Sequence, residues 1–151
     1  QPFDLNESLD QWQNELTQFV NQNKLSFEIT RDLPQGLIVN FDRERIKQIF
    51  INLLTNSIKY TNKPGKVCLN VSVENKKLKL TIEDSAPSVS DNDLTNIFER
   101  LYRVESSRSR ETGGSGLGLA ICKSLIEEHN GKIYAEQSRL GGLKITMELP
   151  C

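Results

Sequence analysis

The segment from Arg43 to Tyr60 constrains the fold most, because its residues divide into two faces when they are placed on an α-helix. At 100° per residue, apolar side chains gather on one side of the helix: Ile46, Ile49, Phe50, Leu53 and Leu54. Polar side chains fall within an arc of roughly 80° on the other side: Arg45, Gln48, Asn52, Asn56 and Lys59. Asp42 is a suitable N-cap for this helix. The apolar face indicates a helix that packs on one side only.

Helical and strand patterns alternate along the rest of the chain. Amphipathic helices are predicted from Leu5 to Val20 and from Gly118 to the Asn130-Gly131 pair, which favours a helix end. The polar stretch between Asp84 and Gly116 contains only a short helical patch, around Leu94 to Phe98. Strands are predicted at these segments: Phe27–Ile29, Leu37–Val39, Lys66–Val73, Leu78–Glu83, Ile133–Ala135 and Leu143–Leu149.

This order of elements predicts one domain over residues 1–151. We expect an α/β (α+β) two-layer sandwich, in which about five strands form a mixed, largely antiparallel sheet and three helices cover one face.

Composition excludes several classes of function. The net charge of −1 provides no broad positive field for nucleic acid or for an acidic membrane surface. The cysteines Cys68, Cys122 and Cys151 are far apart and are accompanied by a single histidine, a pattern that suggests neither a disulfide framework nor a zinc site. The chain contains no run of about 18 apolar residues. A reducing cytoplasm fits this composition best.

The polar stripe on the central helix has two interpretations. It is either the solvated face of an amphipathic helix or a set of ligands. Asparagine is a mediocre helix former, so a face selected only for solubility would more often carry Glu, Lys or Gln than Asn52 and Asn56. An amide oxygen beside a lysine such as Lys59 suits a phosphate-bound Mg²⁺, which takes few protein ligands.

A glycine-rich stretch, Gly113 to Gly118, leads directly into the predicted third helix. Its backbone amides would favour phosphate oxygens, although a flexible hinge with a helix cap is the structural alternative. The spacing is not that of a Walker loop, and the apolar strand that a dinucleotide-binding fold needs is missing before it. Upstream, Asp84 ends a predicted strand, where it is either a turn former or an acceptor for an amine such as that of adenine.

Taken together, these segments resemble the histidine kinase branch of the Bergerat ATP-binding fold, which is shared with gyrase, mismatch-repair ATPases and heat-shock chaperones. Q-I-F-I-N-L-L-T-N-S-I-K-Y-T, from Gln48 to Thr61, resembles the asparagine box. Asp84-Ser85-Ala86-Pro87 occupies the first glycine box, the segment from Ile97 to Arg103 the phenylalanine box, and the segment from Gly114 to Gly118 the second glycine box. The resemblance spans nearly the whole chain.

The resemblance implies that the cofactors are ATP and Mg²⁺. On the central helix, Asn56 would coordinate the metal, Asn52 would help to bind the phosphates, and Lys59 would contact the phosphate chain. Tyr60 would pack against the adenine, whose amine Asp84 would bind.

The resemblance also assigns the region around the second glycine box. The backbone of Gly114, Gly116, Leu117 and Gly118 would cradle the triphosphate, and residues from about Arg100 to Ser115 would form a lid. Phe98 would anchor the base of this lid, and Arg103 is a candidate for reaching the γ-phosphate. One departure from the family pattern is that Ala86 and Ser88 stand where the first glycine box usually has glycines.

Asn52 separates two activities within this fold. The related ATPases resemble one another in carrying a glutamate at this position, one helical turn before the metal-binding asparagine, where it activates water. An amide cannot act as a general base, so the residue favours transfer of the γ-phosphoryl group to another nucleophile. We therefore predict a protein-histidine kinase domain. The alternatives are an ATP-hydrolysing conformational switch of the gyrase or chaperone type and a nucleotide-binding module without chemistry.

The acceptor histidine is expected to lie outside this chain. His129 is predicted at the C-terminal end of the third helix, ~16 Å from the helix start, where a histidine favours the helix dipole and cap. The resemblance implies that the acceptor belongs to a dimerisation and phosphoacceptor domain before Gln1, and that a response regulator is served indirectly. It also implies a monomeric isolated domain in the cytoplasm, within a parent that is anchored in a membrane.

Overall fold

The computed structural model of the chain describes residues 1–99 and 118–151. Its main element is a five-stranded sheet in the order β2-β4-β5-β7-β6. Strand β2 runs parallel to β4, and the other neighbouring pairs are antiparallel. The bounds are β2 Leu25–Asp32, β4 Gly65–Glu74, β5 Lys77–Ser85, β6 Lys132–Gln137 and β7 Gly141–Pro150. The predicted mixed, largely antiparallel sheet is confirmed.

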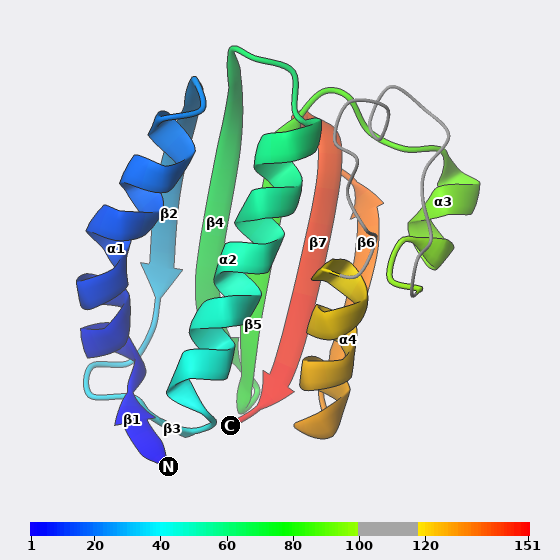
Figure 1. Cartoon of the computed structure of the whole chain (residues 1–151). Helices are drawn as coiled ribbons and strands as arrows, with labels where there is room; N and C mark the ends of the chain where they lie inside the picture. The colour runs from blue at the N-terminus through cyan, green and yellow to red at the C-terminus, as the bar shows by residue number, and fades with distance from the viewer. Residues whose placement is uncertain (100–117) are drawn as a thin grey trace.

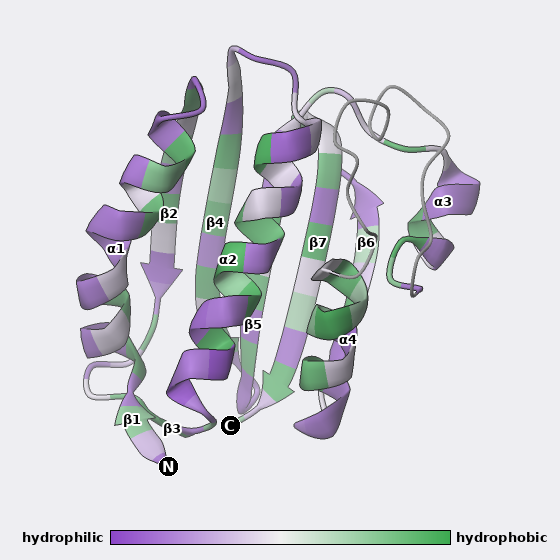
Figure 2. Ribbon diagram, in the orientation of Figure 1, coloured by the Kyte–Doolittle hydropathy of each residue, from purple (hydrophilic) through white to green (hydrophobic). Residues whose placement is uncertain are grey.

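Three helices cover one face of this sheet (Figure 1). They are α1 (Leu5–Asn21), α2 (Arg43–Tyr60) and α4 (Gly118–Glu128). The short helix α3 (Asp91–Asn96) lies beside the edge strand β6. Figure 2 shows that the outward side of α1 and of the first turns of α2 is largely hydrophilic. The two-layer sandwich predicted from the helix and strand patterns is therefore confirmed.

The core lies between these helices and the sheet. Phe50 on α2 is fully buried, and Trp12 on α1 meets it edge to face with the ring centroids 5.7 Å apart. Leu69, Leu80 and Met147 form part of the sheet side of the core, and each is 1% exposed. Burying a side chain of this size stabilises a fold by about 1.5–3 kcal/mol. The apolar face predicted for the central helix is the one that packs on the sheet.

Local sequence signals explain where the elements begin and end. The Asp42 carboxylate accepts hydrogen bonds from the backbone N–H groups of Glu44 and Arg45, so α2 starts where its N-cap predicts. Asn130 has a φ of 61°, and the Gly131 N–H donates to the Ile126 carbonyl at 2.9 Å. This left-handed residue closes α4 as the Asn-Gly pair predicts.

Two elements differ in their bounds from the prediction. The strand expected at Leu37–Val39 lies outside the main sheet, a placement that the sequence pattern did not address. It appears as β3 (Ile38–Asn40), which pairs antiparallel with the short strand β1 (Pro2–Asp4) as a separate ladder. The helical patch expected around Leu94 to Phe98 lies earlier, at α3, because Ser90 caps it by accepting from the Asp93 N–H.

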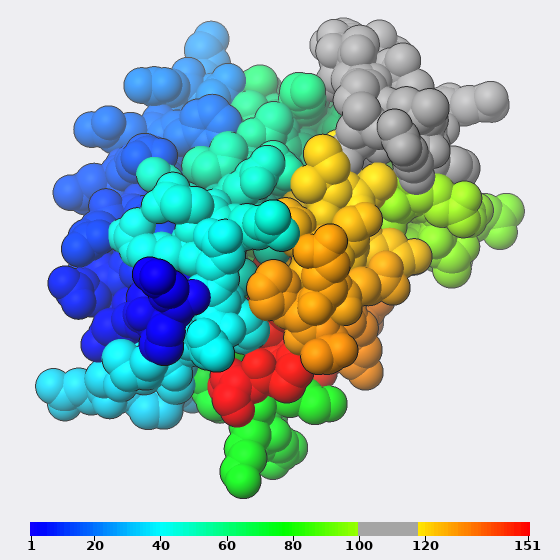
Figure 3. All heavy atoms as spheres, turned by 60° about the horizontal axis from the view of Figure 1, so that its bottom comes forward, coloured from blue at the N-terminus to red at the C-terminus, as the bar shows by residue number. Residues whose placement is uncertain are grey.

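Both chain termini lie at the same end of the molecule, which Figure 3 brings forward. The Cys151 N–H donates to the Lys76 carbonyl at 3.0 Å, which places the C-terminus against the turn between β4 and β5. The C-terminal end of α2 and the end of β5 lie at the opposite end (Figure 1). No helix within residues 1–99 and 118–151 has the length and apolar character needed to cross a membrane.

Candidate functional site

Apart from Phe98, which follows α3, the predicted site residues that the structure describes come from α2, β5 and α4. Asn52, Asn56, Lys59 and Tyr60 occupy the second half of α2, Asp84 lies near the end of β5, and Gly118 begins α4. The ends of α2 and β5 lie at the top of Figure 1, and α4, which packs directly against α2, begins lower, at mid-height. The sheet thus brings together segments that are far apart in the sequence. Arg103, Gly114, Gly116 and Leu117 lie outside the described residues.

Asp84 is the most enclosed of these groups, with only 1% of its surface exposed. Its Oδ2 accepts a hydrogen bond from the Ser57 hydroxyl at 2.9 Å, and its Oδ1 accepts one from the Leu143 backbone N–H at 2.8 Å. The ladder between β5 and β7 shifts register between Glu83 and Ser85, so Asp84 lies at a bulge. These contacts hold the carboxylate in one orientation.

Gly142 lies directly against Asp84. A Cβ at this position would be 2.2 Å from Asp84 Oδ1 and 2.3 Å from the Asp84 carbonyl oxygen. No side chain fits there, so the approach of β7 to the carboxylate depends on glycine. None of Gly142, Ser57 and Leu143 was singled out for this site from the sequence. The hydroxyl of Ser57, one residue after Asn56 on the apolar side of the helix, was the available signal.

The loop after α2 is joined to the segment that follows Asp84. The Asn62 N–H donates to the Ala86 carbonyl at 3.0 Å, and the Lys66 N–H donates to the Ser85 hydroxyl at 2.9 Å. A Cβ on Gly65 would lie 2.7 Å from that same hydroxyl oxygen. The end of α2, with Tyr60, is therefore held against the first glycine box.

The polar residues of α2 have different surroundings in the first and second halves of the helix. At its start, the Arg45 guanidinium lies 3.3 Å from the Glu128 carboxylate at the far end of α4. In the second half of the helix, Asn52 and Asn56 are half-buried and Lys59 is exposed. The Nδ2 atom of Asn56 is buried and has no hydrogen-bond partner among the described residues. An unpaired buried amide is costly, so this atom marks the part of the stripe that is suited to a ligand.

The residues fit a nucleotide with its magnesium ion on two grounds. The Asn56 amide offers a donor that a phosphate oxygen would satisfy and an oxygen of the type that Mg²⁺ takes. Lys59 supplies a positive charge one turn further along α2. Phe98, which the resemblance places at the base of the lid, is 6% exposed beside Ile97.

Cys122 lies beneath this region and was not singled out by sequence reasoning. The side chain is fully buried on α4, facing α2, and its Sγ lies 4.0 Å from the Ile49 carbonyl oxygen. Burial raises the pKa of the thiol to about 12, and a hydrogen bond with the Asn52 side chain opposes part of this rise. Asn52 therefore contacts α4 as well as lining the polar stripe.

The raised pKa of Cys122 predicts a pH dependence of stability. The ordinary thiol pKa of 9.0 applies to the unfolded chain and about 12 to the folded one, so the unfolded chain loses its proton first. The thiol's contribution is complete below pH 9 and is lost as the pH rises towards 12, by up to ~1.4 kcal/mol per pH unit. In urea unfolding at pH 7.5 and 10, Cys122→Ala should lose less stability between the two pH values than the unsubstituted chain.

The exposed Cys151 provides the matched control for this comparison, because Cys151→Ala should leave the pH dependence unchanged. Equal losses of stability in Cys122→Ala and the unsubstituted chain would contradict the assignment to the buried thiol.

His129 lies at the other end of α4 from Gly118. Its Nδ1 lies 2.7 Å from the Leu125 carbonyl oxygen, to which a protonated Nδ1 donates, and its ring meets Phe41 edge to face with centroids 5.4 Å apart. The predicted position of His129, at the C-terminal end of this helix and away from its start, is confirmed.

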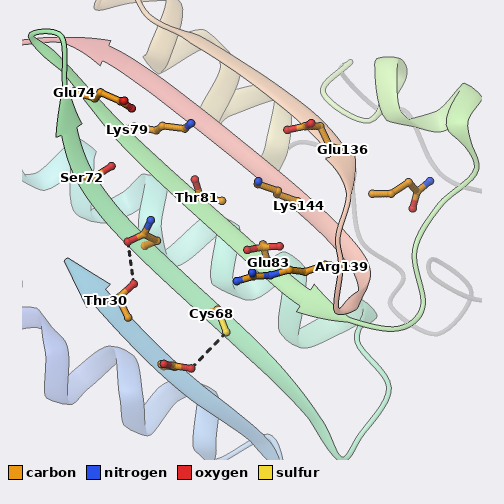
Figure 4. Close-up of a pocket in the computed structure, with 13 residues that line it drawn as sticks. Thr30, Cys68, Ser72, Glu74, Lys79, Thr81, Glu83, Glu136, Arg139 and Lys144 are labelled. Carbon is orange, nitrogen blue, oxygen red and sulfur yellow. Dashed lines mark hydrogen bonds between the residues drawn. The ribbon is translucent and has the colours of Figure 1, made fainter. Parts of the chain in front are cut away.

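The opposite face of the sheet carries a separate hollow of about 650 Å³ (Figure 4). Charges of both signs line it, including Lys79, Glu83, Arg139 and Lys144. Of the predicted nucleotide ligands that the structure describes, none belongs to its lining. This hollow is the solvated side of the sandwich, away from the helices.

Comparison with known proteins identifies the family. A family model described as histidine kinase-, DNA gyrase B- and HSP90-like ATPase matches residues 41–151. The chain is 51% identical over 118 residues to the signal transduction histidine-protein kinase BaeS of Escherichia coli (strain K12), a match that covers 78% of the chain and 25% of BaeS. It is 34% identical over 142 residues to the sensor protein kinase WalK of Staphylococcus aureus, covering 90% of the chain and 34% of WalK. The chain thus spans about a quarter to a third of these relatives.

Solved structures agree with these sequence matches. The catalytic domain of histidine kinase ThkA superposes with a TM-score of 0.81 at 28% identity, covering 99% of this chain and 95% of that domain. The mycobacterial sensor histidine kinase MprB superposes with a TM-score of 0.83 at 25% identity, covering 99% and 97%. The chain therefore belongs to the family of histidine kinase-, DNA gyrase B- and HSP90-like ATPases, and within it to the ATP-binding domains of sensor histidine kinases.

Proposed function

We propose that this domain binds Mg-ATP and donates the γ-phosphoryl group to a histidine on a separate dimerisation and phosphoacceptor domain, as the kinase module of two-component signal transduction. The observation that carries the proposal is the buried Asn56 Nδ2 atom, which has no hydrogen-bond partner among the described residues. Asn56 is followed directly on α2 by Ser57, whose hydroxyl holds Asp84, so the residue assigned to the metal is next to the support of the residue assigned to the adenine.

At the adenine end, the Asp84 carboxylate would accept a hydrogen bond from the exocyclic amine, and Tyr60 would pack against the ring. The Ser57 hydroxyl and the Leu143 N–H hold the carboxylate before the nucleotide arrives, so little ordering remains to be done on binding. This preorganised acceptor selects adenine over a base that carries a carbonyl oxygen at the same position.

At the phosphate end, Asn56 would hold the metal and Lys59 would contact the phosphate chain, with Asn52 nearby. Arg103 and the backbone of Gly114, Gly116, Leu117 and Gly118 would complete the cradle. The bound magnesium ion would neutralise charge on the phosphate oxygens. Because Asn52 is an amide and cannot deprotonate water, the α2 residues bind and orient the triphosphate, and the nucleophile comes from outside the chain.

The expected partners follow from the same proposal. The acceptor histidine would be supplied by dimerisation helices of the same kinase, and the phosphoryl group would pass on to a response regulator. ThkA, to which this chain is similar, has been solved in complex with the response regulator protein TrrA, and that ThkA chain superposes with a TM-score of 0.78 at 26% identity. We further propose that the domain acts in the cytoplasm within a membrane-anchored sensor and is a monomer by itself.

Phosphotransfer in trans tests the proposal. The 151-residue chain is mixed with a dimerisation domain that carries the acceptor histidine and with radiolabelled ATP. We expect acid-labile label on the acceptor domain and no label on this chain. Steady release of phosphate by this chain alone would instead indicate an ATP-hydrolysing switch. Absence of nucleotide binding by calorimetry in the presence of Mg²⁺ would contradict both activities.

Asp84→Asn tests the assignment of the adenine end. The substitution keeps the size of the side chain and an acceptor for the Leu143 N–H, but it adds an amide donor. We expect ATP to bind at least about tenfold more weakly, since two donors would then face each other. Inosine triphosphate has a carbonyl oxygen in place of the amine and should lose less affinity. Calorimetry with both nucleotides measures the change, and an unaltered ATP affinity would exclude this role for Asp84.

A further inference from the structure

In the loop between Asp84 and α3, the part that runs into α3 is bonded to a side chain from the edge of the sheet, that of Gln137. The Gln137 Nε2 donates to the Val89 carbonyl at 2.8 Å and to the Asp91 carboxylate at 3.2 Å. The Ser88 hydroxyl donates to Gln137 Oε1. The side-chain amide of Gln137 therefore uses both of its N–H donors and its carbonyl acceptor in hydrogen bonds to Ser88, Val89 and Asp91.

The backbone of Gln137 connects this loop to Asp84. Gln137 is the last residue of β6 and pairs with Leu143 on β7. Leu143 is the residue whose N–H donates to Asp84 Oδ1 at 2.8 Å. One pair of residues in the β6–β7 ladder thus contacts the segment from Asp84 to Asp91 at both ends. Leu143 bonds to Asp84, and Gln137 bonds to residues between Ser88 and Asp91.

The same contacts reach the start of α3. Asp91 is the first residue of this helix, and Ser90 is its N-cap. Helix α3 packs against β6 and ends just before Ile97 and Phe98, which are each 6% exposed. A helix of this length has little stability of its own, so its position depends on contacts such as that of Gln137.

Ser88 stands where the first glycine box of the family usually has a glycine, and its hydroxyl makes a contact that glycine cannot make. A glycine at this position has no side chain to bond, whereas Ser88 gives its hydroxyl to Gln137. A glycine-containing loop is free to take several conformations, and each hydrogen bond made by Gln137 removes part of that freedom. In this chain the loop is therefore ordered by side-chain bonds.

We propose that Gln137 is a positioning residue for the adenine end of the nucleotide site. It holds the Ser88–Asp91 loop at the distance from Asp84 that allows the carboxylate to select adenine, and it touches no nucleotide atom itself. This inference rests on the proposed function, because it assumes that Asp84 binds the adenine amine.

Calorimetry on the 151-residue chain with Mg-ATP and Mg-inosine triphosphate tests the inference. Gln137→Ala removes all three bonds and should weaken ATP binding by roughly five- to tenfold. Inosine triphosphate cannot donate the amine hydrogen bond to Asp84, so its affinity should change less than about twofold. The ratio of the two affinities therefore falls, which a general loss of folding stability would not produce. Ser88→Gly removes only one of the bonds and should give a smaller fall in the same ratio.

Glu136→Gln is the matched control, because Glu136 is an exposed neighbour on β6 whose side chain makes none of these loop bonds. It should leave both affinities unchanged. An unchanged ATP-to-inosine-triphosphate ratio in Gln137→Ala would overturn the inference, even if the thermal midpoint fell. A lack of ATP binding by the unsubstituted chain would instead overturn the proposed function, so the two failures are distinguishable.

Discussion

Asn56→Ala is expected to reduce phosphotransfer to the acceptor domain at least about 100-fold. A loss of this size is typical when one preorganised polar group that stabilises charge in the transition state is removed. The substitution should leave the stability of the nucleotide-free domain unchanged or slightly raised. The reason is that the Asn56 Nδ2 has no partner among the described residues, so alanine removes an unsatisfied polar atom. Asparagine is also the weaker helix former of the two.

Two measurements separate these effects. Transfer of label from radiolabelled ATP to the acceptor domain gives the activity, and thermal unfolding without nucleotide gives the stability. Gln48→Ala, an exposed polar position two turns earlier on α2, is the matched control and should retain activity. Full phosphotransfer by Asn56→Ala would remove the role assigned to that residue. A large fall in the unfolding temperature would show that Asn56 is a structural residue.

Gly142→Ala is expected to destabilise the domain by about 2–4 kcal/mol. The new Cβ would meet the Asp84 and Ser85 carbonyl oxygens at 2.3 and 2.4 Å, and backbone atoms in a paired ladder cannot withdraw as a flexible side chain can. The fall in Tm for a chain of this length should be roughly 5–15 °C. ATP affinity should fall as well, because the same Cβ displaces Asp84 Oδ1.

Gly118→Ala is the control for stability, since a Cβ at this position would meet no atom of the described residues within 4 Å outside its own helix turn. Alanine is also the better helix former, so the stability of this variant should be equal or higher. Chemical denaturation of both variants measures the difference. Equal stability of Gly142→Ala and the unsubstituted chain would show that β7 moves away from Asp84 at little cost.

Much of the fold could be predicted because its signals are local. The cap residue Asp42, the two faces of α2 and the Asn130-Gly131 ending each act within a few residues of the element they define. The strand at Ile38–Asn40 was found to within one residue but its partner was not, since three residues carry too little pattern to identify a neighbour. Its pairing with β1 depends on where α1 places the N-terminus.

In the candidate site, too, local features could be predicted and contacts between distant segments could not. Residue type and spacing singled out Asn52, Asn56, Lys59 and Asp84 as candidates, and the resemblance to the histidine kinase family assigned their roles. The supports of Asp84 were not singled out, because Ser57 and Leu143 act on it from 27 and 59 residues away along the chain. Nor could the sequence show that the Asn56 amide is left unpaired, which is a property of everything packed around it.

By itself, the sequence determined the helices, the hairpins and the residue types that suit a nucleotide and its metal. These features follow from helix periodicity, strand alternation and backbone capping, all of which are local. The tertiary structure alone decided which backbone N–H meets Asp84, why Gly142 has no room for a side chain, and how Gln137 reaches Ser88. These contacts depend on the register between β5, β7 and β6, because a shift of one residue would turn every side chain of a strand to the other face of the sheet.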